Sequence, residues 1–225
     1  MMTKHFRWPF LALLAAFFFA TNVAEVSYFG VSSKWSSRDG YLFSGGTQLW
    51  ALAFAGTVIG FYFLLMYAES GNLAQPLPGV FRRFVAFWID FALAMIAVGP
   101  ILGIVPMLVE WKRTGIFRWS FERTSYAPGD ALLVTAALMV GCAALVLYYA
   151  LPLVYSKPSP GTCITGYQVV AEEGPNLTLR TALLRTLLGF VAVCGAYVAP
   201  FVARDRENGK FWLDKVFGTR ALRLS

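Results

Sequence analysis

The chain has 225 residues, of which 58% are hydrophobic, 16% aromatic and 14% charged, and its mean hydropathy is +0.60. Soluble domains are about 45–50% apolar and about 25% charged, so this composition excludes an ordinary water-soluble globule. The excess of 19 Lys and Arg over 12 Asp and Glu gives a formal charge of +7. Because the basic residues lie mostly between apolar runs, they indicate membrane topology and contact with anionic lipid, and we expect no nucleic-acid partner.

The residue types that carry most enzyme chemistry are scarce. His5 is the only histidine, and Cys142, Cys163 and Cys194 form no CxxC pair. The sequence contains no GxGxxG, GxxxxGK[ST] or HExxH spacing, which phosphate-binding loops and helical zinc sites require. We therefore expect no catalytic residues, no cofactor and no metal site, and predict that the chain is not an enzyme.

Five apolar runs without charged residues predict the fold class. A helix needs about 20 residues to cross the hydrocarbon layer, and continuous apolar runs favour helices over the alternating strands of a barrel. We therefore predict an all-α, polytopic transmembrane helical bundle with about five membrane segments, a short strand and an amphipathic helix near the C-terminus. The runs are Trp8 to Ala24, Gly40 to Ala68, Phe91 to Val109, Ala131 to Ser156 and Thr186 to Ala203.

Residues 1–72 are predicted to form a membrane region of two helices. The first apolar run follows Lys4, His5 and Arg7, as in a signal peptide, but no clear cleavage site comes after it, so we interpret it as an uncleaved signal anchor. Serine and glycine in residues 27–47 predict a flexible loop before the second span.

The distribution of basic residues bears on topology. With the N-terminus inside and five full spans, fewer Lys and Arg lie in the cytoplasm than outside, against the positive-inside tendency. Inverting the chain corrects this, and so does a re-entrant last run, which Gly189, Gly195 and Pro200 would tolerate. Both solutions place the C-terminal tail in the cytoplasm and leave the side of the N-terminus open. We expect a multi-pass protein of a bacterial cytoplasmic membrane.

Residues 110–130 interleave basic and apolar side chains. This pattern predicts a loop lying on the lipid surface, although basic and aromatic residues together also bind anions or rings. The residues are Lys112, Arg113, Arg118 and Arg123 with Ile116, Phe117, Trp119 and Phe121.

Asp90 is the one acid placed well inside a long apolar segment, between Phe84 and Val109. A charge at this depth costs roughly 2.5–3.5 kcal/mol on insertion scales, so Asp90 must face the bundle and find a partner or a proton. Arg83 lies about 10 Å earlier along a helix and on nearly the same face. Arg185, at the start of the last run, is a competing partner.

The C-terminal part reads as a series of short elements. Prolines and glycine end the fourth apolar helix, CITGYQVV is typical of a short strand, and a following helix is capped near Thr178. Asp205 to Phe217 predicts an amphipathic interfacial helix ended by Gly218. The residues that end the fourth helix are Pro158, Pro160 and Gly161.

Residues 79–225 resemble the RDD family of membrane proteins, named for one arginine and two aspartates. The likeness is carried, in order, by RRFVAFWID, PSPGTCITGYQVV, LTLRTALLRTLL and WLDKVFGTRAL. It implies that the family's charged triad corresponds to Arg83, Asp90 and Asp214, as an ion pair or as a cation or proton site. The family usually has a basic residue after Pro-Gly, where this chain has Thr162 and Cys163.

Two interpretations of Asp214 stay open at the sequence level. It could be a solvated or helix-capping acid near the head groups, or it could join the tail to the bundle through a salt bridge to Arg83 or Arg185.

Two functions compete. The first is a structural or partner-binding membrane component, whose partners would be the lipid bilayer and a second copy or another membrane protein. The second is transport coupled to a proton or a monovalent cation, with Asp90 as the titrating group. The family resemblance also implies transport, which would require an oligomer because the family unit has few spans.

Overall fold

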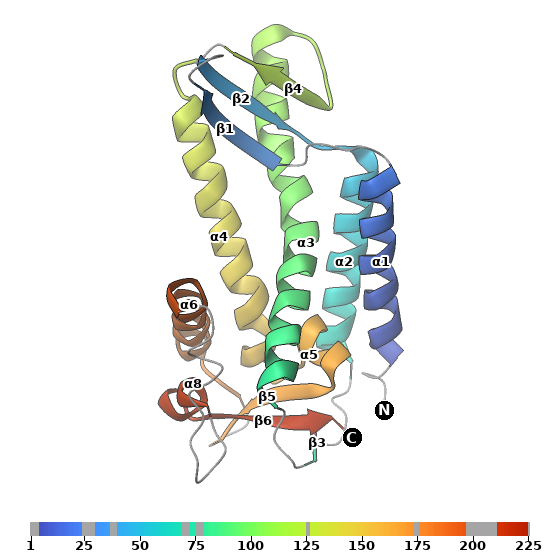
Figure 1. Cartoon of the computed structure of the whole chain (residues 1–225), viewed down its shortest axis with the longest axis vertical. Coiled ribbons are helices and arrows are strands. Elements are labelled where there is room, and N and C mark those ends of the chain that lie inside the picture. Colours follow the sequence, from blue (N-terminus) through green and yellow to red (C-terminus); the bar gives the residue numbers. More distant parts are fainter. Residues whose placement is uncertain are drawn as a thin grey trace. The chain divides into compact units, whose positions relative to one another are not determined.

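The computed structural model of the chain describes residues 5–23, 30–36, 40–68, 73–74, 79–124, 127–172, 176–196 and 211–224. Within these residues the protein is mostly helical and has two small three-stranded sheets (Figure 1). The helices are α1 (Arg7–Val23), α2 (Leu49–Tyr67), α3 (Val80–Thr114), α4 (Asp130–Val154), α5 (Pro160–Thr165), α6 (Leu179–Ala196) and α8 (Trp212–Val216).

Three of the described helices are long and apolar enough to cross a membrane. They are α2, the Phe81–Thr114 part of α3, and α4, with mean hydropathies of 2.0, 2.4 and 2.4. Helix α1 is also apolar over Arg7–Thr21, but it is shorter. Because a helix satisfies its own backbone hydrogen bonds, such segments are stable in lipid. The predicted fold class is confirmed, although only three of the five expected segments reach this length among the described residues.

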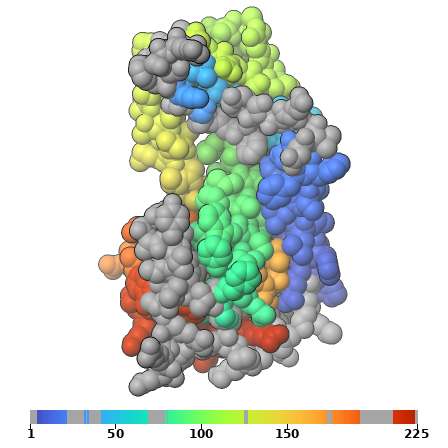
Figure 2. All heavy atoms as spheres, viewed as in Figure 1, coloured from blue at the N-terminus to red at the C-terminus, as the bar shows by residue number. Residues whose placement is uncertain are grey.

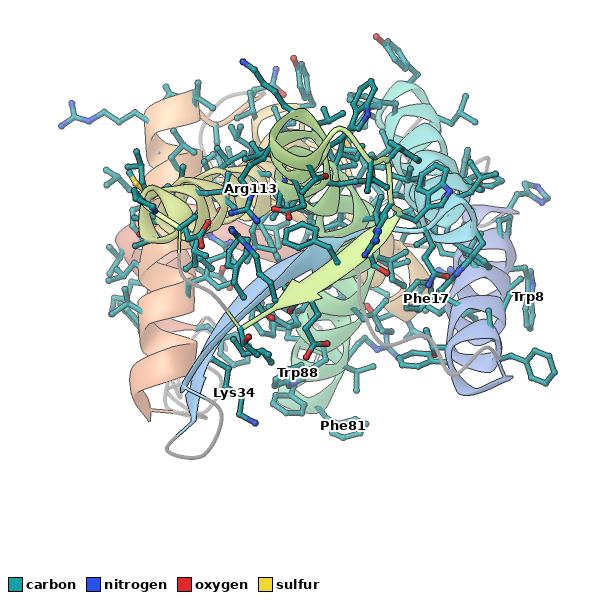
Figure 3. All side chains as sticks on the ribbon, turned by 90° about the horizontal axis from the view of Figure 1, so that it is seen from above. Trp8, Phe17, Lys34, Phe81, Trp88 and Arg113 are labelled. Atoms are coloured by element: carbon teal, nitrogen blue, oxygen red, sulfur yellow. The ribbon has the colours of Figure 1, made fainter. Side chains whose placement is uncertain are left out.

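Exposed aromatic side chains agree with a lipid environment. Trp8 of α1 is 76% exposed, and Phe81 of α3 is 78% exposed. These two side chains and Trp88 point away from the ribbon (Figure 3). Exposing such an aromatic surface to water is unfavourable, whereas lipid tails and the membrane interface accommodate it.

The chain divides into two compact units, each built from segments that are distant in the sequence. Unit 1 contains Met1–Leu14, Gly60–Leu93 and Val146–Ser225, and unit 2 contains Ala15–Ile59 and Ala94–Leu145. Both units therefore draw on residues from the N-terminal region and from the RDD-like region.

Unit 2 contains a sheet where a flexible loop was predicted. Strand β1 (Gly30–Ser36) pairs antiparallel with β2 (Gly40–Gly46), and β2 pairs antiparallel with β4 (Ser120–Arg123). The loop prediction for residues 27–47 is therefore wrong over the two strands. The serines and glycines of this stretch are typical of a loop, but in the structure Phe43 and Ser44 of β2 are only 1% and 3% exposed.

The small residues of this hairpin have specific packing roles. The Ser32 and Ser44 hydroxyls lie 2.7 Å apart across the strand pair. A Cβ atom at Gly45 would lie 2.8 Å from the Pro106 ring, so the strand approaches α3 closely only because this residue is glycine. The apolar run from Gly40 to Ala68 is thus divided between a strand and α2, and is not one long span.

The segment of residues 110–130 is also more ordered than predicted. Helix α3 continues to Thr114, and β4 joins the sheet. Arg123 forms an ion pair with Asp130, and its Nε lies 3.8 Å from a carboxylate oxygen of Glu110. Its guanidinium carbon lies 5.0 Å from the centre of the Phe43 ring. Arg123 is therefore held within unit 2 rather than on a lipid surface.

Unit 1 contains the second sheet, in the order β3-β6-β5. Strand β6 (Thr219–Leu224) pairs antiparallel with both β3 (Leu73–Ala74) and β5 (Tyr167–Ala171). In Figure 1 these strands lie together beside the beginning of α3. The tail therefore returns to the bundle as a strand, which the sequence pattern did not predict.

The predicted boundaries of the C-terminal elements hold in part. Helix α4 ends at Val154, before Pro158 and Pro160, and the Thr178 hydroxyl accepts a hydrogen bond from the Thr181 amide at the start of α6. The predicted strand CITGYQVV is wrong over its first residues, which form the end of α5. Gly166 ends this helix with φ 78°, a left-handed conformation that favours glycine.

The amphipathic helix predicted for Asp205 to Phe217 is described only from residue 211 onward. Over those residues it is the short helix α8, which ends at Val216. Gly218 follows this helix and has a φ of 57°. Residues 205–210 lie outside the described part of the chain, as do residues 197–203, on which the choice between a crossing and a re-entrant last segment depends.

Candidate functional site

Arg83 and Asp90 lie two helical turns apart near the beginning of α3, where both are buried with 8% and 2% exposure. Both side chains contact the C-terminal elements of unit 1, whose orange and red atoms flank the green start of α3 in Figure 2. The two residues nevertheless have different partners among the described residues. They belong to two adjacent polar clusters.

Asp90 is held by the segment that joins α4 to β5. Its Oδ2 accepts a hydrogen bond of 2.5 Å from the Ser159 hydroxyl, and its Oδ1 accepts one of 2.7 Å from the Gly161 amide. The Tyr148 hydroxyl donates a longer bond of 3.3 Å to the same Oδ1. Both carboxylate oxygens therefore have neutral donors, and the described residues make no ion pair with Asp90.

The sequence PSPG explains why this segment fits Asp90. Ser159 supplies a hydroxyl and forms the N-cap of α5, while Pro160 takes the first helical position, where its missing N–H is not needed. A Cβ atom at Gly161 would lie 2.8 Å from the Asp90 carboxylate and would also collide with the Ala86 carbonyl. Only glycine lets the backbone amide come this close.

Tyrosines from two other helices surround the Asp90 cluster. The Tyr62 hydroxyl donates to the Tyr148 carbonyl at 2.8 Å, and the two rings stack with centroids 4.8 Å apart. The Tyr149 hydroxyl donates to the Phe87 carbonyl at 2.9 Å. This packing fixes the position of the Tyr148 hydroxyl that reaches Asp90.

The second cluster is a buried ion triad centred on Asp214 of α8. Arg83 Nη1 lies 2.6 Å from Asp214 Oδ2, and Arg185 Nη2 lies 2.8 Å from Asp214 Oδ1. The Thr219 hydroxyl donates to the same Oδ1 at 3.1 Å. Asp214 is only 1% exposed, so it is not a solvated acid, and it pairs with both arginines that were considered as alternatives.

Electrostatics keeps Asp214 ionised. Burial acts to raise the pKa of its carboxyl group, but Arg185 and Arg83 outweigh this effect and hold the pKa below its ordinary value. A carboxylate between two guanidinium groups is more stable than the acid form, so the tail is joined to the bundle by charge at neutral pH.

The guanidinium of Arg83 is only partly used by this triad. Its Cζ atom lies 4.0 Å from the centre of the Phe211 ring, in a cation–π arrangement. Its Nε and Nη2 atoms are buried and have no hydrogen-bond partner among the described residues.

A cavity of about 160 Å³ connects the two clusters within unit 1. Its polar lining includes Arg83, Asp90, Lys157 and Arg185, and its apolar walls come mainly from α3, α4, α6 and Phe211. Lys157 also donates a short hydrogen bond to the Ala68 carbonyl. The predicted site residues are thus all close to one cavity, although Asp90 and Asp214 are held in different ways.

Two contributions to this region were missed at the sequence level. The sequence pattern indicates only a helix break at Gly161 and does not single out Ser159, although a Ser-Pro-Gly segment also offers a hydroxyl and an accessible amide. Arg7 of α1 donates from Nε to the Cys163 carbonyl at 2.9 Å, so the N-terminal helix contacts α5. Burial raises the pKa of the Cys163 thiol to about 12, which keeps it uncharged.

Comparison with protein-family models identifies a family for most of the chain. Residues 77–218 match the RDD family, which is more than half of the chain. The protein belongs to the RDD family. A search of curated proteins gives no match, and a search of solved structures gives none. Within this RDD protein, Arg83 and Asp90 are among the residues that line the cavity of unit 1, and Asp214 forms an ion pair with Arg83.

Proposed function

We propose that this RDD protein is a structural or partner-binding component of a membrane and has no enzymatic activity. The observation that carries the proposal is the setting of Asp90. Its carboxylate accepts three hydrogen bonds from Ser159, Gly161 and Tyr148. Because these direct hydrogen bonds occupy both oxygens of the carboxylate, Asp90 is suited to fixing the packing of α3 against α5.

The ion triad supports the same proposal. Asp214 pairs with two arginines that belong to α3 and α6, so one short helix joins three parts of unit 1. Buried charged groups of this kind often specify one packing arrangement among several, although they add little net stability. A uniquely packed bundle would present a constant surface to a second copy or to another membrane protein.

Transport of a proton or a monovalent cation is the second candidate. It is favoured by one observation, the position of Asp90 on the wall of a cavity that also contains Lys157 and Arg185. An acid at membrane depth facing such a space is a default candidate for ion coupling. In each transport cycle, Asp90 would have to exchange its three hydrogen-bond donors for a cation.

Reconstitution distinguishes the two functions. We would compare wild-type protein and Asp90→Asn in proteoliposomes, measuring sodium, potassium and proton flux, together with the folded yield of each. The scaffold proposal expects no flux from either protein and a lower folded yield for Asp90→Asn. Glu122→Gln, at an exposed acid of unit 2, is the matched control for removal of one carboxylate.

Cation flux by the wild type that is lost in Asp90→Asn, with a folded yield equal to that of the control, would reject the scaffold proposal in favour of transport. Flux that persists in Asp90→Asn would also reject it, and would in addition exclude Asp90 from the transport mechanism.

The proposed location is a bacterial cytoplasmic membrane, with the C-terminal tail in the cytoplasm. The support is the excess of Lys and Arg that this orientation assigns to the cytoplasmic side. A reporter fused after Ser225 that is active only in the cytoplasm tests the orientation. Activity of a periplasmic reporter at the same position would contradict it.

A further inference from the structure

We propose that the cavity of unit 1 binds a phosphate group, with Arg83 as its principal ligand. Nη1 of Arg83 is engaged by Asp214, while Nε and Nη2 have no hydrogen-bond partner among the described residues. These two atoms form one edge of the guanidinium and present two parallel N–H donors.

Burying this edge of the guanidinium is energetically unfavourable unless its two N–H groups donate to an acceptor. Arg83 is 8% exposed and lines the cavity, so solvent reaches little of it. Buried donors without acceptors are destabilising. The parallel pair of donors has the spacing that an oxyanion accepts in two hydrogen bonds, which is the geometry that distinguishes arginine from lysine at phosphate sites.

The charges around the cavity also favour an anion. Arg83, Arg185 and Lys157 line it, with Asp90 as the acid in the lining and Asp214 behind it. Three cations against two carboxylates leave one positive charge uncompensated when both acids are ionised. An anion in the cavity would balance that charge at low dielectric, where the attraction is strong.

The size and walls of the cavity admit more than a bare ion. A water molecule needs only about 10–15 Å³ of such space, and this cavity has about 160 Å³. Phe87, Tyr149 and Phe190 form an aromatic side of the lining. Two sources of phosphate fit this arrangement, the headgroup of an anionic phospholipid and a free phosphate from solution.

The test measures binding to purified, delipidated full-length protein. One arm titrates inorganic phosphate and follows thermal unfolding. The other arm uses native mass spectrometry on protein equilibrated with nanodiscs of phosphatidylglycerol or of phosphatidylcholine alone. Stabilisation by inorganic phosphate identifies a free phosphate as sufficient, whereas selective retention of phosphatidylglycerol alone identifies the lipid headgroup. Either result supports the site.

Arg83→Lys is the diagnostic variant, because it keeps the charge near Asp214 and removes the two-donor edge. We expect it to weaken binding by about tenfold, the effect of losing a charge-assisted hydrogen bond. Arg82→Lys, one position earlier on α3, is the matched control and should bind like the wild type. Equal binding by the wild type and a folded Arg83→Lys protein overturns the proposal.

If Arg83→Lys does not fold, binding measurements on the wild type alone still test the proposed phosphate site. Wild-type protein that is stabilised by neither inorganic phosphate nor phosphatidylglycerol, and that retains phosphatidylglycerol no better than phosphatidylcholine, has no such site.

Discussion

Asp90 and Asp214 are both buried in unit 1, but their partners differ in kind. Asp90 accepts hydrogen bonds from neutral groups, namely Ser159, Gly161 and Tyr148. Asp214 lies between two guanidinium groups, those of Arg83 and Arg185. Two carboxylates that are buried to a similar extent can therefore stabilise the structure through different kinds of partner.

The difference concerns what remains when the acid is removed. Loss of the Asp214 charge leaves two buried cations without a counterion, which is strongly unfavourable. Loss of the Asp90 charge leaves a hydroxyl and an amide that can still bond to a neutral oxygen. We therefore expect the Asp214 cluster to be more sensitive to substitution than the Asp90 cluster.

Asp214→Asn should have the largest effect. Breaking a buried ion pair by removing one partner costs about 3–5 kcal/mol, and here one substitution affects two arginines. Chemical unfolding in detergent would measure the change, with Glu122→Gln as the control at an exposed acid. A loss of stability no greater than that of the control would mean that the triad contributes nothing to the fold.

Gly161→Ala should have the next largest effect, about 2–3 kcal/mol, because the added methyl group overpacks the site. It would lie 2.8 Å from the Asp90 carboxylate and would push α5 away from α3. Gly189→Ala in α6 is the control, since a Cβ there meets nothing within 4 Å. That change should be neutral or slightly stabilising. Similar losses in both variants would contradict the close approach at Gly161.

Asp90→Asn should have a smaller effect, about 1–2 kcal/mol, since asparagine keeps one oxygen acceptor in the same place. The unfolding experiment used for Asp214→Asn measures it directly. If Asp90→Asn proves more destabilising than Asp214→Asn, the ranking of the two clusters is reversed and Asp90 has a partner beyond its three described donors.

Features that lie within one element could be predicted well from the sequence. The apolar runs predicted the long helices, because lipid requires about 20 continuous apolar residues. Helical periodicity also placed Arg83 and Asp90 on one face of α3. The family resemblance identified Asp214, although neither periodicity nor spacing could decide between its two interpretations.

The partners of Asp90 could not be predicted in the same way. Ser159 and Gly161 are separated from Asp90 by 69 and 71 positions, and only the packing of α5 against α3 brings them together. The β1–β2 hairpin was missed for a related reason. Its serines and glycines are typical of loops, and they become strand residues only through cross-strand hydrogen bonding and close contact with Pro106.

The titration of Asp214 should have the smallest effect on stability near neutral pH. The folded-state pKa of this group is lowered, so its contribution to stability is fully present above the unfolded pKa of about 3.9 and is lost as the pH falls through the folded value. Between pH 7 and pH 5 we expect Asp214 to cause no change in the midpoint of unfolding. Below about pH 4 the wild type should lose stability relative to Asp214→Asn, because only the wild type has this carboxylate to protonate. Unfolding midpoints of both proteins across this pH range measure the difference, with Glu122→Gln as the control. If the gap between wild type and Asp214→Asn instead narrows between pH 7 and pH 5, the pKa of Asp214 is raised, and burial outweighs the two arginines.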